Sequence, residues 1–211
     1  MWGIRLTIAI RLDFLILNKK ILVLASTSRY RAELLARLQF PFQTFKPTID
    51  ESPLPGEQPR ATALRLAISK AKSARATFPQ ALIIGADQVA DLDGRHIGKP
   101  GARAAAILQL QAMRNRQLIF HSGICLFNTE TGQIQSQVVS TTVHFRNYSD
   151  SEMAVYLDRE DALDCAGSAK SEGLGVALMS CMTSDDPTAL IGLPLIALNN
   201  MLLNEGVQVL A

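Results

Sequence analysis

Apolar and polar positions along the chain form short strand-like runs and helical stripes in turn. The first run is Ile21–Ala25, which is wholly apolar. It leads into a segment with Leu34, Leu35 and Leu38 on one helical face, and Ser28 stands where an N-cap is expected. The sequence therefore predicts a strand, a tight turn and a helix at the start of the folded region.

Two more elements follow a loop rich in proline and acidic residues, KPTIDESPLPGEQP. A helix is predicted by an apolar stripe made of Leu64, Ala67, Ile68 and Ala71. After it, the apolar run Leu82–Ala86 predicts a second buried strand. This strand would deliver Asp87 at its C-terminal end, where α/β folds place their ligands.

The second half of the chain continues the mixture of helices and strands. We expect a helix over Ala102–Met113, a hairpin around a Thr131–Gly132 turn, a helix near Asp150–Leu157, a strand near Leu174–Met179 and a last helix from Pro194 to Asn204 closed by Gly206. There are no internal repeats and no low-complexity linker. The pattern predicts an α/β (α+β) domain with a mixed sheet.

Composition narrows the class of protein. A chain of 211 residues with 48% apolar side chains can bury a substantial core, as one domain or two closely joined lobes. Its 21 basic and 19 acidic residues are spread along the chain, which argues against a nucleic-acid partner. The 3 cysteines lie far apart without C-x-x-C spacing, so neither a disulfide framework nor a zinc site is indicated. We expect a cytoplasmic protein.

The first 20 residues are apolar, but Arg5, Arg11 and Asp13 interrupt every apolar run. Each run is therefore well short of the ~20 residues that a membrane span requires. No small-residue cleavage site follows. We expect residues 1–20 to be a dispensable extension outside the fold, with no membrane partner, and residues 21–211 to be the domain.

A candidate anion site lies where the first strand runs into the first helix. The hydroxyls of Ser26 and Ser28 would join unpaired backbone N–H groups and the positive end of the helix dipole. Arg29 and Arg31 would add guanidinium donors, which match phosphate oxygens. An ordinary capped helix would carry the same residues, so this stretch alone leaves both interpretations open.

The other parts of a phosphoryl-transfer site are also present in the chain. Asp50, Glu51 and Asp87 are hard oxygen ligands of the kind that Mg²⁺ uses together with substrate phosphates. Lys70 and Lys99 are candidate cations for the phosphates, and Lys99 lies in a glycine-proline turn. Each of these residues taken singly is also compatible with a solvated surface charge, except Asp87, for which the alternative is an ordinary turn aspartate.

A third cluster is CAGSAKSEGLG, Cys165–Gly175. Its small residues would let the backbone approach a ligand, while Lys170 and Glu172 project from it. A plain loop rich in glycine and serine is the alternative interpretation.

Taken together, these segments resemble the Maf proteins, which are nucleoside triphosphate pyrophosphatases. The resemblance is carried, in order, by LASTSRYRAELL, IDE, SKAK, IIGADQV, GKP, CAGSAKSEG and GLPL. It implies a Maf/ITPase-like fold, in which an elongated mixed β-sheet flanked by helices forms two lobes around a central cleft. The forms LASTS, GADQV and AGSAKSEG are most similar to the subgroup that hydrolyses 7-methyl-GTP.

The resemblance also assigns roles to individual residues. It implies that Asp87 is the catalytic carboxylate and that the triphosphate is held by Ser26, Arg31, Lys70 and Lys99. Asp50, with Glu51 beside it, matches the acidic position linked to metal binding, together with Asp87. Substrate choice is linked to Tyr30, Gln88 and Glu172. The chain departs from the family at Arg29, where proline is common, and at Tyr30, where tryptophan occurs.

The expected function is that of a hydrolase acting on acid anhydrides. A divalent cation, Mg²⁺ or Mn²⁺, would assist cleavage between the α- and β-phosphates, with 7-methyl-GTP as the leading substrate and removal of modified nucleotides as the purpose. The alternatives are the same reaction on dTTP, UTP or inosine triphosphate, or a non-catalytic nucleotide-binding regulator of septum formation. The family commonly dimerises, which leaves a homodimer open.

Overall fold

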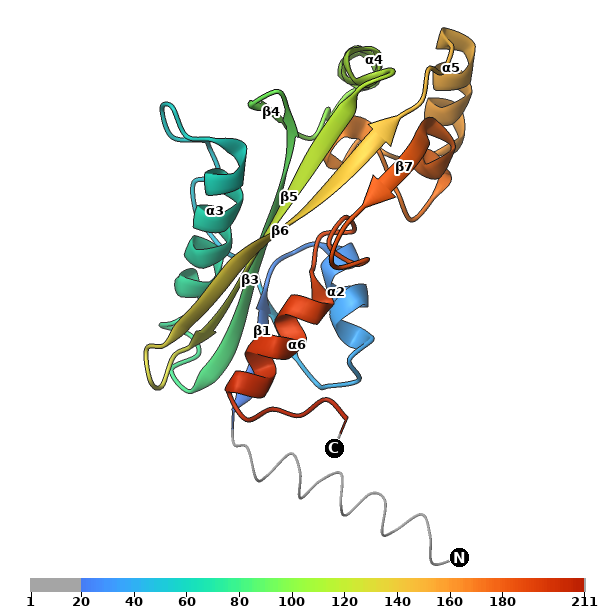
Figure 1. The fold of residues 1–211 in the computed structure, drawn as a ribbon. Coiled ribbons are helices and arrows are strands. Elements are labelled where there is room, and N and C mark those ends of the chain that lie inside the picture. Colours follow the sequence, from blue (N-terminus) through green and yellow to red (C-terminus); the bar gives the residue numbers. More distant parts are fainter. Residues whose placement is uncertain (1–19, 211) are drawn as a thin grey trace, which may run out of the picture.

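The computed structural model describes residues 20–210, which form a mixed sheet with helices on both faces (Figure 1). The sheet has 7 strands in the order β2-β1-β3-β5-β6-β7, with β4 paired to β3. The strands are β1 Ile21–Ala25, β2 Gln43–Phe45, β3 Ala81–Leu92, β4 Arg95–Ile97, β5 Gln117–Asn128, β6 Ile134–Phe145 and β7 Met179–Thr183. The α-helices are α2 Arg29–Ala36, α3 Pro59–Ser73, α4 Arg103–Met113, α5 Asp150–Arg159 and α6 Leu195–Asn204. Within residues 20–210, no helix has the length and apolar character needed to cross a membrane.

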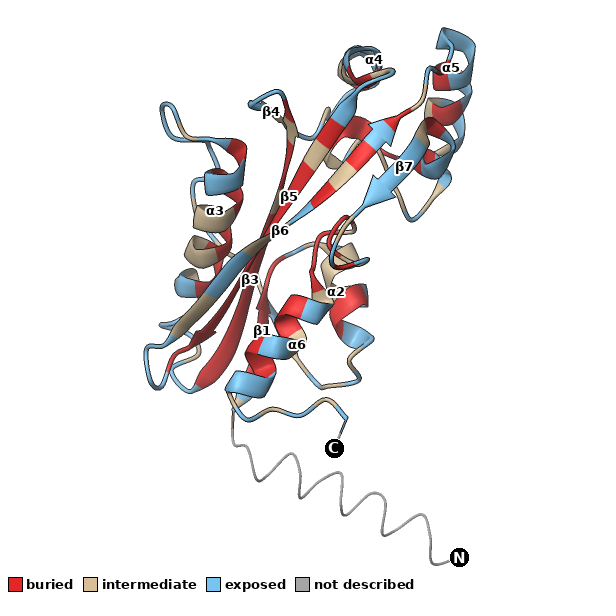
Figure 2. Ribbon diagram, viewed as in Figure 1, coloured by how far each residue is buried: buried red, intermediate tan, exposed pale blue. Residues whose placement is uncertain are grey.

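The long antiparallel strands give the sheet its elongated form. β1 pairs in parallel with β2 and β3, whereas β3, β5, β6 and β7 pair antiparallel. β3, β5 and β6 each have 12 residues, and buried positions dominate β3 and β5 (Figure 2). These long strands extend beyond β1 and connect two groups of helices. The expected mixed sheet and α/β class are confirmed.

The core is divided among three clusters. On one face of the sheet, α2 and α6 pack on β1, β3 and β5, and α3 packs on the opposite face. At the far end of the β5–β6 hairpin, α4 and α5 enclose a third cluster that includes Phe120 and Tyr148 (Figure 1). The helices around β1 and those at the far end therefore form separate groups on one sheet.

Two glycines let α3 lie directly against the sheet. A Cβ on Gly85 would be 2.0 Å from the carbonyl oxygen of Ala67, and one on Gly123 would be 2.2 Å from that of Ala63. Any side chain at these positions would push the helix away. Gly123 is the cross-strand partner of Asp87, so the close approach lies beside that carboxylate.

Several elements differ from the sequence expectation. β3 continues to Leu92, so Asp87 lies in the middle of a strand and not at its C-terminal end. The physical reason is that β5 supplies partners as far as Asp91, whereas the pairing with β1 stops at Gly85. Asp87 therefore lies just beyond the point where the parallel pairing of β1 with β3 ends. At this point β1 ends, as expected, but β3 continues.

Smaller differences concern the buried stripe of α3, the strand predicted near Met179 and two short strands. The buried stripe of α3 includes Ala63, Leu66, Ala67 and Ala71, whereas the predicted Leu64 and Ile68 are only half-buried. The strand predicted near Leu174–Met179 is wrong, because Leu174–Leu178 is a 3₁₀ helix and the strand follows it. The short strands β2 and β4 were not predicted. The expectation for residues 1–20 falls almost wholly outside the described residues.

Candidate active site

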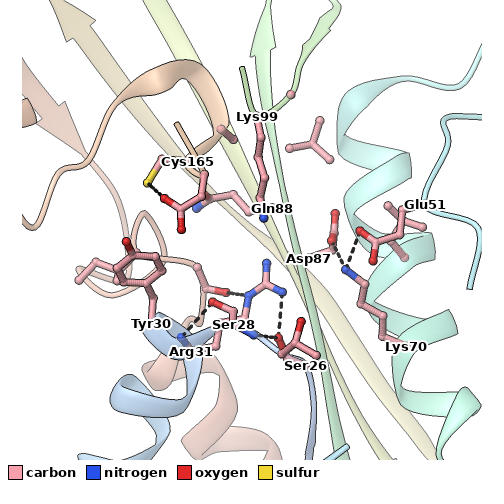
Figure 3. A pocket seen from close by; sticks show the side chains of 18 of the residues that line it. Ser26, Ser28, Tyr30, Arg31, Glu51, Lys70, Asp87, Gln88, Lys99 and Cys165 are labelled. Atoms are coloured by element: carbon pink, nitrogen blue, oxygen red, sulfur yellow. Dashed lines mark hydrogen bonds and ion pairs between the residues drawn. The ribbon is translucent and has the colours of Figure 1, made fainter. Parts of the chain in front are cut away.

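A cavity of about 870 Å³ opens where the start of α2, the middle of β3 and one face of α3 meet (Figure 3). Four loops complete its wall: residues 46–53, the loop around Lys99, the loop from Asp161 to Glu172, and residues 190–192. Most of the predicted site residues line it, namely Ser26, Tyr30, Arg31, Glu51, Lys70, Asp87, Gln88, Lys99 and Glu172. Segments far apart in the sequence therefore converge on a single cavity.

A buried ion pair forms one wall of this cavity. Lys70 Nζ donates to Asp87 Oδ1 at 2.6 Å, and both side chains are buried. Glu51 Oε2 lies 3.1 Å from the same ammonium nitrogen. In Figure 3, Lys70 extends from α3 towards both carboxylates. One cation and two carboxylates from three separate segments thus meet at one point.

The start of α2 forms the opposite wall, and its geometry follows the predicted capping. Ser28 is the N-cap, and its side chain accepts a hydrogen bond from the backbone N–H of Arg31 at 3.4 Å. Ser26 Oγ accepts from the backbone N–H of Ser28 at 3.1 Å. Hydroxyls, backbone N–H groups and the positive end of the helix dipole therefore face the cavity together, which suits an anion.

The guanidinium of Arg31 is fixed by backbone carbonyls. Its Nη1 donates to Ala86 O at 2.7 Å and to Ser26 Oγ at 3.5 Å, and its Nε donates to Gly192 O at 3.0 Å. Burial lowers the pKa of Arg31 from its ordinary value, while the charges of Asp87 and Glu51 act in the opposite direction. Its Nη2 has no hydrogen-bond partner among residues 20–210, which leaves this donor available to a ligand.

The predicted specificity residues Tyr30 and Glu172 lie on another part of the cavity wall. The ring of Tyr30 has the guanidinium carbon of Arg29 at 4.8 Å and Lys170 Nζ at 5.9 Å from its centroid. Glu172 is exposed, and its only hydrogen bond to another described residue is from Ser171 Oγ at 3.4 Å. An aromatic ring and a carboxylate with an acceptor oxygen free of any described partner therefore lie on the same cavity.

Gln88 holds a neighbouring loop in place. Its side-chain nitrogen donates to Ala189 O at 3.0 Å, to Leu190 O at 2.8 Å and to Ser122 Oγ at 3.1 Å. Ser122 Oγ in turn donates to Ala189 O at 2.6 Å. The same loop supplies Gly192 O to Arg31, so Gln88 is linked to Arg31 through the loop backbone.

Lys99 and Asp50 complete the set of predicted residues. Lys99 is exposed and extends into the cavity, and the structure gives it no ion pair among residues 20–210. Asp50 is not among the residues that line the cavity, because its Oδ1 accepts from the backbone N–H of Ser52 at 2.9 Å. The structure therefore places the Glu51 carboxylate, but not that of Asp50, beside the ion pair of Lys70 with Asp87. A metal role for Asp50 stays a prediction.

The donor set is compatible with one divalent cation. Glu51 and Asp87 already direct oxygens at a single positive group, the ammonium of Lys70. No group of three or more His, Cys, Asp or Glu residues that could hold a metal occurs within the described range. Mg²⁺ in nucleotide sites commonly takes one or two carboxylates and completes its shell with phosphate oxygens and water. Two carboxylates in a cavity that is also lined by cationic side chains fit that requirement.

Cys165 also lines the cavity, but its chemistry is unsuited to nucleophilic attack. Burial raises the pKa of the Cys165 thiol to about 12, so the thiolate is scarce near neutral pH.

Sequence reasoning missed Asp186, which fixes the loop that carries Gly192. Its buried carboxylate accepts from the backbone N–H groups of Ile196 at 2.7 Å and Ala197 at 3.4 Å, and from the Thr188 hydroxyl at 2.7 Å. It therefore caps α6 from outside the helix, because Pro194 at the N-cap has no side-chain acceptor. Capping patterns place the cap next to the helix, so no local signal could have identified it.

A second missed group lies at the N-terminal end of α3. Arg65 makes two hydrogen bonds of 2.7 Å to Glu57 and lowers the pKa of that carboxyl to about 2. Glu57 also accepts from Thr62 Oγ1 at 2.8 Å, and Thr62 Oγ1 lies 2.8 Å from His96 Nε2. Thr62 and His96 line the cavity, so this chain of contacts stiffens its wall.

Comparisons with known proteins agree with this geometry. A family profile described as Maf-like protein matches residues 21–205. The chain is 55% identical over 189 residues to a protein named 7-methyl-GTP pyrophosphatase from Thiobacillus denitrificans, covering 90% of this chain and 94% of that protein. Proteins of the same name from Methylobacillus flagellatus, 56% identical with 90% and 98% covered, and Burkholderia pseudomallei, 57% identical with 88% and 87% covered, are similar to it. The chain belongs to the Maf family.

Proposed function

We propose that this protein is a nucleoside triphosphate pyrophosphatase that hydrolyses 7-methyl-GTP to the monophosphate and pyrophosphate. The observation that carries the proposal is the buried Lys70–Asp87 pair, which faces the Arg31 guanidinium across one cavity. The name of the similar proteins supports the choice of substrate. The cytoplasmic location and a homodimeric state stay predictions.

In the proposed reaction, Asp87 accepts a proton from a water molecule as that water attacks the α-phosphorus. The bond between the α-phosphorus and the oxygen that bridges to the β-phosphorus breaks, and pyrophosphate leaves with that oxygen. Lys70 stands beside Asp87 and offsets the negative charge that gathers on the phosphates. The buried position of the pair strengthens these electrostatic effects relative to water.

Arg31, Ser26 and the first N–H groups of α2 bind the phosphates in the proposed complex. Ala86 O and Gly192 O already fix the Arg31 guanidinium, so the position of its Nη2 is set before the substrate binds. Such preorganised donors contribute to catalysis because they need no rearrangement when charge develops. Lys99 adds a further cation, which extends into the cavity from a separate loop.

We propose that Glu51 and Asp87 hold a divalent cation, Mg²⁺ or Mn²⁺, together with phosphate oxygens. When bound, such a cation polarises the phosphoryl group and neutralises charge on the polyphosphate. Both carboxylates lie beside the Lys70 ammonium. Lys70 would add its own positive charge beside the phosphates.

At the other end of the substrate, Tyr30 and Glu172 are proposed to bind the base. An N7-methylated guanine carries a positive charge, which the face of an aromatic ring attracts. Glu172 can accept hydrogen bonds from the N1–H and N2–H₂ edge of guanine. Both side chains line the cavity, and the Glu172 carboxylate is exposed.

The test is a substrate panel with purified protein and Mg²⁺ or Mn²⁺. 7-Methyl-GTP, GTP, dTTP, UTP and inosine triphosphate are compared by kcat/KM, with pyrophosphate and orthophosphate measured separately. We expect pyrophosphate and monophosphate in equal amounts and the highest kcat/KM for 7-methyl-GTP. A higher value for a pyrimidine triphosphate contradicts the substrate, and release of orthophosphate contradicts the bond that is cleaved.

A further inference from the structure

The ring of Tyr30 already has a cation against it. The guanidinium carbon of Arg29 lies 4.8 Å from the ring centroid, and Arg29 Nη2 donates to Tyr30 Oη at 2.7 Å. Arg29 lines the cavity, and its side chain is exposed. The guanidinium therefore occupies part of the surface that the proposed base-binding ring offers.

The second cation near this ring, Lys170, is held differently. Lys170 Nζ lies 5.9 Å from the centroid of Tyr30 but donates to Glu160 Oε1 at 2.6 Å. Glu160 also accepts from the backbone N–H of Leu174 at 2.8 Å, so it is fixed in place. Arg29, by contrast, makes no ion pair with any residue in the described range. The charge of Lys170 is compensated locally, whereas that of Arg29 is free to act on a ligand.

Three carboxylates also line the cavity, namely Asp161, Asp164 and Glu172. The pKa of Arg29 is raised, first by its hydrogen bond to Tyr30 and, more weakly, by the charges of Asp164 and Asp161. The carboxylates of Asp161 and Asp164 therefore favour a positive charge beside the Tyr30 ring. In this structure that charge is the Arg29 guanidinium.

We infer that Arg29 is a specificity-determining residue, whose charge competes with a positively charged base for the Tyr30 ring, while Asp161 and Asp164 favour such a base. This inference rests on the proposed function. A cationic base is repelled by Arg29 and attracted by the two carboxylates, whereas neutral guanine responds little to either. Removing these charges should change the preference for 7-methyl-GTP over GTP in opposite directions.

The experiment measures kcat/KM for 7-methyl-GTP and for GTP by pyrophosphate release in four variants. Arg29→Gln removes the positive charge but keeps a long polar side chain, and Arg29→Lys keeps the charge. Asp161→Asn with Asp164→Asn removes both negative charges. The matched control is Arg37→Gln, which changes an exposed arginine just after the same helix that does not line the cavity.

We expect Arg29→Gln to raise the ratio of kcat/KM for 7-methyl-GTP to kcat/KM for GTP by about threefold, as is typical of exposed charge interactions. The double aspartate variant should lower this ratio by a similar factor. Arg29→Lys and the control should leave the ratio near that of the unchanged protein. Both changes should shrink as salt is raised, because the charges are exposed. The ratio is insensitive to a general loss of folded protein, and thermal unfolding of each variant checks that loss separately.

Three results overturn the inference. An unchanged ratio in Arg29→Gln shows that the charge does not act on the base. An equal fall of kcat/KM for both nucleotides shows that Arg29 contacts the phosphates instead. If the unchanged protein releases pyrophosphate from neither nucleotide, the proposed function fails and the inference fails with it. In the first two cases the proposed function stands.

Discussion

Lys70 Nζ lies 2.6 Å from Asp87 Oδ1, and both side chains are buried at the place where α3 crosses β3. The helix lies very close to the sheet at this place, because Gly85 and Gly123 have no Cβ to meet the α3 backbone. Backbone packing therefore sets the distance over which the two side chains meet.

Replacing Lys70 should harm both stability and turnover. Lys70→Met leaves the buried Asp87 carboxylate with one cationic partner fewer, and breaking a buried pair in this way costs about 3–5 kcal/mol. Turnover should fall by about 100-fold or more, because a cation beside the phosphates is lost. Lys70→Arg keeps the charge and serves as the control. Urea unfolding and pyrophosphate release measure the two effects, and wild-type values for both in Lys70→Met would contradict this role.

Gly85→Ala should separate the helix from the sheet. The new Cβ would lie 2.0 Å from the carbonyl oxygen of Ala67, so α3 must shift. We expect a loss of about 1–3 kcal/mol in the free energy of unfolding, together with lower activity because Lys70 moves away from Asp87. A matched change is Gly98→Ala, since a Cβ there meets nothing within 4 Å and its stability should be within about 0.5 kcal/mol of the original. Equal stabilities for the two variants would argue against the close packing.

Gln88→Met should act through the loop that Gln88 holds, without adding a charge to the cavity. The methionine side chain has no donor to replace the amide nitrogen that donates to Ala189 O and Leu190 O, so both bonds are lost. The loop would release Gly192 O from Arg31, and kcat/KM should fall by about tenfold or more for every nucleotide alike. The deciding measurement is the ratio of kcat/KM for 7-methyl-GTP to kcat/KM for GTP, which should stay constant. A change in that ratio would instead indicate direct contact between Gln88 and the base.

Asp186→Ala should destabilise the protein from a position outside the cavity. It removes the acceptor for Ile196 N–H, Ala197 N–H and the Thr188 hydroxyl, and it leaves these groups in a poorly hydrated place. We expect a loss of about 2 kcal/mol or more in the free energy of unfolding. The neighbouring Asp185 is exposed, and Asp185→Ala provides the control. If the two alanine variants unfold at the same urea concentration, Asp186 does not cap α6.

The features that the sequence predicted well are local. Ile21–Ala25 is the first strand with the predicted bounds, Ser28 is the cap, and the turn around Gly132 joins the long hairpin. Each depends on residues within a few positions of one another, and such patterns are visible in a single segment.

The features that the sequence could not predict depend on distant partners. The length of β3 past Asp87 is set by pairing with β5, whose partner residues lie 28 to 34 positions further along the chain. Asp186 caps a helix that begins 9 residues later, and Arg31 receives its backbone partner from Gly192. Glu51 reaches Lys70, whereas the adjacent Asp50 turns to Ser52, a choice made by the loop backbone. Most residues that line the cavity could therefore be predicted from the sequence, but the contacts that orient their side chains could not.

Pyrophosphate release from 7-methyl-GTP by Asp87→Asn tests whether Asp87 accepts the proton from the attacking water. Asparagine keeps the shape of the side chain but cannot take up the proton. We expect release to fall by about 10³-fold or more, whereas nucleotide binding, measured by calorimetry, persists. Undiminished release by Asp87→Asn would show that Asp87 is not the proton acceptor.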